Sequence, residues 1–437
     1  MIRQCHVSLF LIFGTILVLL DIFYSEVETP LLPSNRLPQP TLNDNPIDVN
    51  SSLLAGMNRF EWYRSMYFKD ENTTKLKTAS NLSTLYAYEF EHEFTVTVTN
   101  FYFLGYRVYC RYLDENGKEI GNAEESLSYP VFVVNCPKRA GTKKIGLSAD
   151  DVGHFQPLPI VDRMLKEPKY ELSMCIATLY GDEPKWLMLI EMIEHYKLQG
   201  VQHFYLHIHN VSLYDLKAVN EYVRTGELEV AYLLEQEQQK RNDREWHMVH
   251  VADCAVRSRK ESRWTIFADL DERILMTKYP GTILDYVRKV KNETVAVLQF
   301  RQQWILKTEF MPERYDGDQQ LDTWMPTHRW HNSSGIGPPG HTAKCIVDTS
   351  KVLAMKIHYP QRFYPDHGYH TKKLDPEEGI VRHYRDQTMW DWGKNWLPGV
   401  LRFGPLRMTD YPSKLLGKLT ENVKKRANLV YGNAKNE

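Results

Sequence analysis

The strongest constraint on the fold is a regular alternation of strand and helix patterns that starts after Pro168. Apolar runs typical of buried strands are separated by segments with helical spacing, and glycine follows two of these segments, as it often does at the end of a helix. Helices that cross over between successive strands predict an α/β fold with a mostly parallel, Rossmann-like sheet. The predicted strands cover 172–179, 204–208, 228–234 and 264–268, and the predicted helices cover 184–198, 213–224 and 243–261.

The chain before this alternation has a different pattern. Between about residues 80 and 135, short runs rich in aromatic and β-branched residues flank an Asp-Glu-Asn-Gly turn sequence at 114–117. Such runs predict antiparallel β structure. The runs lie at 94–98, 101–103 and 131–134.

The composition is that of an ordinary folded protein of 437 residues, with 54 Lys and Arg residues against 55 Asp and Glu. Together with 43% hydrophobic and 12% aromatic residues, this composition excludes intrinsic disorder and coiled coil as the main state of the chain. Since the net charge is −1 and no long block of like charge occurs, we expect neither a nucleic-acid partner nor a polybasic membrane patch.

The N-terminus predicts entry into the secretory route. Arg3 precedes residues 7–20, a run of fourteen residues without a charge, and the residues after it lack the small side chains of a cleavage site. These features favour a retained signal anchor of type II topology, with the rest of the chain in the lumen. A stretch rich in Pro, Asn and Ser follows as a stem. The expected divisions are a cytosolic tail at 1–6, an anchor at 7–24, a stem at 25–60, a β-rich accessory domain at 61–165 and an α/β domain at 166–437.

Two further features agree with a luminal location. Six Asn-x-Ser/Thr triplets are candidate N-glycosylation sites. Five cysteines follow the expected anchor, so at most two intramolecular disulfides and one remaining thiol are expected, and the absence of a Cys-x-x-Cys pair argues against structural zinc. The triplets begin at Asn50, Asn72, Asn81, Asn210, Asn292 and Asn332, and the cysteines are Cys110, Cys136, Cys175, Cys254 and Cys345.

The fourth predicted strand ends in two aspartates, Asp269 and Asp271. In open α/β sheets, ligands bind just outside the carboxyl ends of the strands. Two carboxylates at this spacing can enter one crevice and bind a hard divalent cation that keeps positions free for a diphosphate. A glycine cradle is a poor alternative, because the G-x-G-x-x-G match at 335–340 follows polar residues and contains two prolines.

Motifs occur along the chain at 175–181, 186–191, 195–205, Asp253-Cys254 with Arg257 and Arg259, 267–272, and His383-Tyr384-Arg385. In this order they resemble those of glycosyltransferase family 92. The resemblance implies a GT-A fold, a type II Golgi membrane enzyme and a UDP-sugar donor, with galactose as the sugar. It also implies Mn²⁺ at the Asp-x-Asp sequence and an inverting transfer to a glycan hydroxyl on a glycoprotein or glycolipid.

The resemblance suggests metal ligands. Asp271, and less directly Asp269, would hold Mn²⁺ against the donor diphosphate, where the metal acts as a Lewis acid. GT-A enzymes commonly take a third ligand from a late histidine, for which His383 is preferred here and His358 is the alternative.

It also suggests contacts to the donor. Ala177 and Thr178 end the first predicted strand, where GT-A enzymes bind uridine, although ordinary strand-end residues would look the same. Arg257 is a candidate for the diphosphate, but its helical spacing from Asp253 favours the alternative of a surface ion pair.

The acceptor side is less defined. Asp391, flanked by Trp390 and Trp392, is a candidate base whose neighbouring indoles would stack on sugar rings; the alternative is a helix-start acid beside core aromatics. The family's usual Phe-Gly-Ser-type segment is replaced by other residues at 330–335. A catalytically inactive glycan-binding homologue and a secreted adhesion protein remain alternatives, whereas a metal-dependent phosphoesterase would need more His and Asp ligands.

Overall fold

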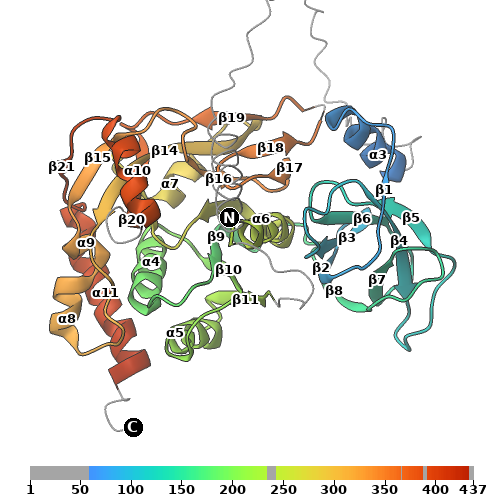
Figure 1. Ribbon diagram of the computed structural model, residues 1–437, viewed down its shortest axis with the longest axis horizontal. Coiled ribbons are helices and arrows are strands. Elements are labelled where there is room, and N and C mark those ends of the chain that lie inside the picture. The colour runs from blue at the N-terminus through green and yellow to red at the C-terminus, as the bar shows by residue number, and fades with distance from the viewer. Residues whose placement is uncertain (1–58, 234–242, 366, 387–390, 433–437) are drawn as a thin grey trace, which may run out of the picture. The chain divides into compact units, whose positions relative to one another are not determined.

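The structure is a computed structural model that describes residues 59–432 except 234–242, 366 and 387–390 (Figure 1). The predicted tail and anchor, nearly all of the stem, Asn50 and Trp390 lie outside the described residues. Among the helices that are described, none has the length and apolar character needed to cross a membrane.

The N-terminal part of the described chain is one helix followed by an eight-stranded sheet. The helix is α3 (Arg59–Asp70), and the strands are β1 (Lys77–Thr78), β2 (Thr84–Glu89), β3 (Glu93–Val98), β4 (Tyr106–Leu113), β5 (Glu124–Leu127), β6 (Val133–Pro137), β7 (Lys144–Ser148) and β8 (Leu158–Asp162). The strand order is β1-β4-β7-β8-β2-β3-β6, with β5 paired to β4. The predicted β structure is therefore confirmed, and the β1–β4 and β2–β8 pairs are parallel among antiparallel neighbours.

The prediction of a strand at 101–103 is wrong. It forms part of the turn between β3 and β4, in which Tyr102 has a positive φ of 38° and Phe101 is exposed. The side chain of Asn100 accepts from the Ser83 amide and donates to the carbonyl of Asn81, so local side-chain bonds take the chain out of the sheet.

The strand and helix alternation after Pro168 is confirmed. Its elements are β9 (Tyr170–Leu179), α4 (Trp186–Leu198), β10 (His203–Ile208), α5 (Leu213–Arg224), β11 (Leu228–Tyr232), α6 (Asp243–Ser258) and β12 (Ser262–Ala268). The four strands lie in the order β11-β10-β9-β12 and are parallel to their neighbours.

Beyond β12 the sheet is mixed, so the expected mostly parallel arrangement holds for these first strands only. Only three residues separate β12 from the next strand, too few for a crossover helix, and that strand pairs antiparallel with β20 rather than with β12. The remaining elements are β13 (Glu272–Met276), α7 (Ile283–Arg288), β14 (Val295–Lys307), α8 (Asp318–Trp324), α9 (Pro326–Arg329), β15 (Asn332–Ile336), β16 (Lys344–Val347), β17 (Val352–Met355), β18 (Pro360–Phe363), β19 (His370–Lys373), β20 (Gly379–Asp386), α10 (Asp391–Leu401), β21 (Arg407–Met408) and α11 (Ser413–Tyr431). The whole sheet has eleven strands, and β16 is antiparallel to both β12 and β14.

The long strand β14 brings distant parts of the chain together. Its first half pairs with β16 and β19, and its second half pairs with β15 and β20. Strand β20 also pairs with β13, so that His383 has Glu272 as its partner on one side and Trp304 on the other. This register places a late histidine beside the Asp-x-Asp sequence.

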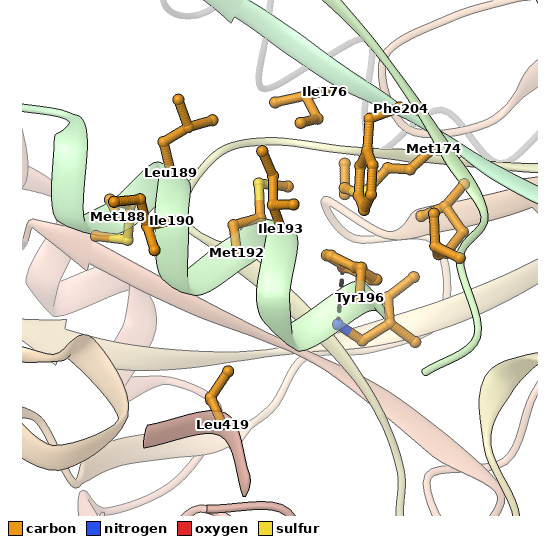
Figure 2. Close-up of a cluster of buried hydrophobic side chains, with 14 of the residues drawn as sticks. Met174, Ile176, Met188, Leu189, Ile190, Met192, Ile193, Tyr196, Phe204 and Leu419 are labelled. Carbon is orange, nitrogen blue, oxygen red and sulfur yellow. Dashed lines mark hydrogen bonds between the residues drawn. The ribbon is translucent and has the colours of Figure 1, made fainter. Parts of the chain in front are cut away.

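Helix α4 forms the centre of the larger core. Its residues from Trp186 to Tyr196 are all buried, because the helix packs on the sheet and against α11 (Figure 1). Figure 2 shows apolar side chains of α4 close to Met174 and Ile176 of β9 and Phe204 of β10.

Helix α6 is buried on two faces. Val249 and Val256 belong to the core of the N-terminal sheet, whereas Val251 and Cys254 belong to a core beneath the central sheet. A disulfide between Cys175 of β9 and Cys254 fixes the helix to the central sheet.

The predicted cysteine chemistry is confirmed for the described residues. A second disulfide joins Cys110 of β4 to Cys136 of β6, and Cys345 remains as a buried thiol. The count of two disulfides and one thiol equals the maximum expected from five cysteines.

One buried histidine in the core has both ring nitrogens bonded. Nε2 of His195 lies 3.0 Å from the carbonyl oxygen of Ile274, so Nε2 carries the hydrogen and Nδ1 accepts from the hydroxyl of Tyr411. Burial, and then the charge of Arg273, lower the pKa of His195 from 6.5 to about 3.

We expect this histidine to make stability depend on pH. The unfolded chain binds a proton at His195 that the folded chain excludes, so the contribution is complete above pH 6.5 and is lost as the pH falls towards 3. His195→Gln should therefore flatten the dependence of unfolding free energy on pH by up to about 1.4 kcal/mol per pH unit. Urea denaturation between about pH 7 and pH 5 measures this slope.

Tyr411→Phe is the matched control for this prediction. It removes the hydrogen bond to Nδ1 but keeps the histidine, and burial raises the pKa of Tyr411 far above this range. The control should lower stability at every pH and leave the slope unchanged. An unchanged slope in His195→Gln would contradict the prediction.

Candidate functional site

The site is built on the tight turn between β12 and β13. Oε2 of Glu272 accepts a hydrogen bond of 2.7 Å from the amide of Asp269, and the Asp269 carbonyl accepts one of 3.1 Å from the Glu272 amide. The carbonyl of Asp271 accepts from the amide of Tyr384 on β20 at 2.8 Å. The turn is therefore held from within and from a neighbouring strand, at the carboxyl end of β12.

Asp271 lies beside His383. Its Oδ2 is 3.1 Å from Nε2 of His383 and 3.9 Å from the guanidinium of Arg385, and its side chain is 25% exposed. Burial alone would raise the pKa of Asp271, but His383 and Arg385 lower it to about 2. Asp271 is thus an ionised carboxylate with access to solvent.

Asp269 faces a different set of partners. The buried ammonium of Lys344, the first residue of β16, lies 2.9 Å from Oδ1 of Asp269 and 3.2 Å from Oε2 of Glu272. Nε2 of His247, on the first turns of α6, lies 3.3 Å from the same Oδ1. Burial would raise the pKa of Asp269, but Lys344 and then His247 hold it well below its usual range.

The pKa of the third carboxylate, Glu272, is raised, whereas the pKa values of the two aspartates are lowered. Burial, together with the negative charge of Asp269, raises the pKa of Glu272 to about 7 despite the nearby Lys344. The neighbouring carboxylates raise the pKa of Lys344 above its usual range although burial opposes this. Lys344 is therefore a fixed positive charge beneath the turn.

The pair of Asp271 and His383 fits a divalent cation. An octahedral ion that holds its ligands at about 2.1 Å places neighbouring ligands about 3.0 Å apart, close to the 3.1 Å between Oδ2 and Nε2. Carboxylate and imidazole ligands suit ions such as Mn²⁺. No cluster of three or more metal-ligating side chains is formed by the part of the chain that the structure describes. An ion at this pair would take its remaining ligands from substrate oxygens and water, as nucleotide-bound Mg²⁺ does.

The family model of glycosyltransferase family 92 matches residues 170–419, more than half of the chain. The chain belongs to glycosyltransferase family 92. The matched region begins with β9 and includes Asp269, Asp271, Lys344 and His383.

The individual proteins that are similar to this family 92 chain share only a small part of its sequence. The β-1,4-galactosyltransferase galt-1 of Caenorhabditis elegans is 21% identical over 282 residues, which make up 60% of this chain and 62% of that protein. The chain therefore spans less than two thirds of that relative's length. A structure described as the crystal structure of a mycobacterial protein covers 60% of this chain and 75% of its own, with 11% identity and a TM-score of 0.24, too low to inform the fold.

Of the two histidines considered as ligands, the structure brings His383 to Asp271. His358 instead has its Nδ1 3.2 Å from the carbonyl oxygen of Ala343, and burial and then the charge of Lys344 lower its pKa to about 3. His358 is therefore a neutral neighbour of Lys344.

Of the residues expected to contact the donor, two lie at the carboxyl end of a central strand, and the third lies far from the aspartates. Ala177 and Thr178 are buried at the carboxyl end of β9, and the Thr178 hydroxyl donates to the carbonyl of Trp246 on α6. Arg257 is not brought to the aspartates, because it lies ten residues beyond His247 on α6, roughly 15 Å along the helix.

Arg257 does pair with Asp253, at 3.1 Å, but this ion pair is buried and not on the surface. Tyr86 and Tyr88 of the N-terminal sheet lie against its guanidinium, and Glu229 also contacts it. The expectation of a surface pair was wrong because the sequence did not show that a second sheet covers this end of α6.

The remaining predicted site residues are Asp391 and the glycosylation candidates. Asp391 begins α10, and its side chain lies outside the described residues. The five glycosylation candidates within the described residues, Asn72, Asn81, Asn210, Asn292 and Asn332, are all exposed, as attachment of a glycan requires. A hollow of about 630 Å³ lies at the start of β14, between Tyr279, Lys289 and Lys372, and neither aspartate lines it.

Sequence reasoning missed Lys344, His247 and the role of Glu272. Glu272 could have been suspected, since it follows Asp271 directly. Lys344 carried no signal, because its contact depends on the antiparallel pairing of β16 with β12, in which Cys345 faces Phe267.

We expect Lys344→Met to destabilise the protein by about 3–5 kcal/mol, because it leaves the buried Glu272 and the partly buried Asp269 without their cation. Chemical denaturation measures the change in unfolding free energy. Lys278→Met is the matched control, since Lys278 pairs with Glu377 on the surface and its loss should have little effect. Equal stabilities of the two variants would show that Lys344 does not hold the turn.

Proposed function

We propose that this chain is a metal-dependent inverting glycosyltransferase that moves a hexose from a UDP-sugar to a glycan hydroxyl. The observation that carries the proposal is the placement of Asp271 beside His383 at the carboxyl end of a parallel strand, in a chain of family 92. This is where open α/β sheets bind their ligands, and the four parallel strands are compatible with a GT-A fold. Galactose is the proposed sugar, since galt-1 is named as a β-1,4-galactosyltransferase.

Asp271 and His383 would hold the cation, with Mn²⁺ as the proposed ion. When bound, the ion supplies a Lewis acid that neutralises the diphosphate of the departing UDP. Arg385, 3.9 Å from Asp271 and 37% exposed, adds positive charge on the same side. Arg385 and the bound ion would together offset the negative charge that builds up on the leaving group.

Lys344 and Glu272 are positioning residues in this proposal. Lys344 keeps Asp269 ionised and fixed, and Glu272 holds the amide of Asp269. The turn therefore does not need to rearrange when a charged ligand binds, which lowers the cost of binding. Ala177 and Thr178, at the end of β9, are the proposed neighbours of the uridine.

An inverting transfer needs a base for the acceptor hydroxyl on the face opposite the departing UDP. Asp391 is the proposed base. It begins α10, the helix that also carries Trp396.

We also propose that the enzyme works in the Golgi lumen as a single-pass type II membrane protein. The uncharged run at 7–20 supports this as a signal anchor. Exposed Asn-x-Ser/Thr triplets and two disulfides agree with passage through an oxidising compartment.

The pairing of Lys344 with Asp269 favours one alternative, a glycan-binding homologue without activity. A lysine that already neutralises the first aspartate reduces the negative charge available to a metal. The two functions differ in whether UDP is released.

The test is UDP release by the purified full-length chain from a panel of UDP-sugars, with a mixed glycan acceptor and either Mn²⁺ or EDTA. We expect release from one donor, loss of release in EDTA, and a fall of at least about 100-fold in Asp271→Asn, since the change removes a charge that holds the ion. Asp322→Asn, at an exposed carboxylate on α8, is the control and should keep full activity.

Release that is unaffected by EDTA and by Asp271→Asn would contradict the metal-dependent mechanism. Folded protein that binds UDP-galactose yet releases no UDP from any donor would establish the glycan-binding alternative.

A further inference from the structure

A group of aromatic side chains lies next to the Asp271–His383 pair. Trp304 of β14 is the register partner of His383, and the centroids of their rings are 6.3 Å apart. Trp396 of α10 lies on Trp304 with a centroid separation of 6.3 Å and an angle of 58° between the rings. His341 lies 6.4 Å from Trp304.

We propose that Trp304 and Trp396 form a platform that binds a pyranose ring of the acceptor. This inference rests on the proposed function, because the acceptor is defined only for a transferase. It assigns the acceptor side of the site to Trp304 and Trp396. The sequence instead predicted acceptor stacking at Trp390 and Trp392.

Exposure distinguishes Trp396 from a core residue. Trp304 is 7% exposed and supports the platform from below, whereas Trp396 is 47% exposed. About half of the Trp396 indole is thus left in water and forgoes the free energy of its burial. A ligand with an apolar face would recover part of it. Phe403, whose ring lies 5.0 Å from that of His341, extends the aromatic surface.

The position of Trp396 relative to the ion-binding pair indicates that its ligand is the acceptor. An acceptor hydroxyl must reach the sugar carbon attached to the diphosphate, so the acceptor has to lie beside the ion-binding pair. The two ring separations place Trp396 no more than about 13 Å from His383. A donor hexose and one acceptor ring together can span this distance.

The chemistry of the platform also suits a sugar. One face of a β-galactoside or β-glucoside ring consists of C–H groups, which pack against an indole, while the hydroxyls at its edge remain hydrated. Carbohydrate and ligand sites commonly combine such aromatic surfaces with a few polar groups. Here the polar group is His341, whose ring lies 6.4 Å from that of Trp304.

The test uses saturation-transfer NMR on the full-length chain with methyl β-galactoside, methyl β-glucoside and methyl N-acetyl-β-glucosaminide, in the presence of UDP and Mn²⁺. We expect at least one glycoside to bind the wild type with the strongest transfer to the ring protons of one face. Trp396→Ala should weaken that binding by about tenfold, and Trp396→Phe should restore part of it. Phe101→Ala, at an aromatic that is 53% exposed on the N-terminal sheet, is the matched control and should bind like the wild type.

UDP affinity, measured by calorimetry on the same samples, separates this inference from the proposed function. Wild type that binds UDP but no glycoside, or Trp396→Ala that binds glycosides as the wild type does, would overturn the platform. Wild type that binds a glycoside through Trp396 but no UDP with any metal would support the platform and contradict the transferase. Equal loss of UDP and glycoside binding in both Trp396→Ala and Trp396→Phe would show that Trp396 is structural and would also overturn it.

Discussion

The burial of α6 between two sheets is the constraint on which the rest of the structure depends. At its centre is Asp253, a fully buried carboxylate that accepts from Thr97 and Tyr88 of the N-terminal sheet. On the other side it is bonded to His207 of β10 and to Arg257. Burial alone would raise its pKa, but Arg257 and His207 hold the pKa of Asp253 well below its usual range. A buried charge with this many partners fixes the helix in one position.

The position of α6 then determines part of the site. Ten residues before Arg257, His247 meets Asp269, and the Trp246 carbonyl accepts from Thr178 at the end of β9. The N-terminal sheet is therefore linked to the site through the helix although no strand of it carries a site residue. This gives the β-rich segment a physical role, which is to cover the outer face of α6.

Within the site, the two aspartates of one short motif have different tasks. Asp269 pairs with the buried Lys344 and with His247, whereas Asp271 pairs with His383, although both aspartates are partly exposed. The sequence predicted the alternation of strands and helices and the location of both aspartates, because these depend on local periodicity and on the ends of strands. It could not predict Lys344 or the burial of Arg257. The first follows from the pairing of β16 with β12, and the second from a sheet encoded more than a hundred residues earlier.

We propose that Asp271 and His383 bind the metal while Lys344 retains Asp269. The most direct test is a crystal structure of the protein with UDP and Mn²⁺, in which anomalous scattering locates the ion. The account predicts a peak bonded to Asp271 and His383, with the Lys344 ammonium still on Asp269. A peak bonded to Asp269 with Lys344 displaced, or UDP bound without any ion, would contradict it.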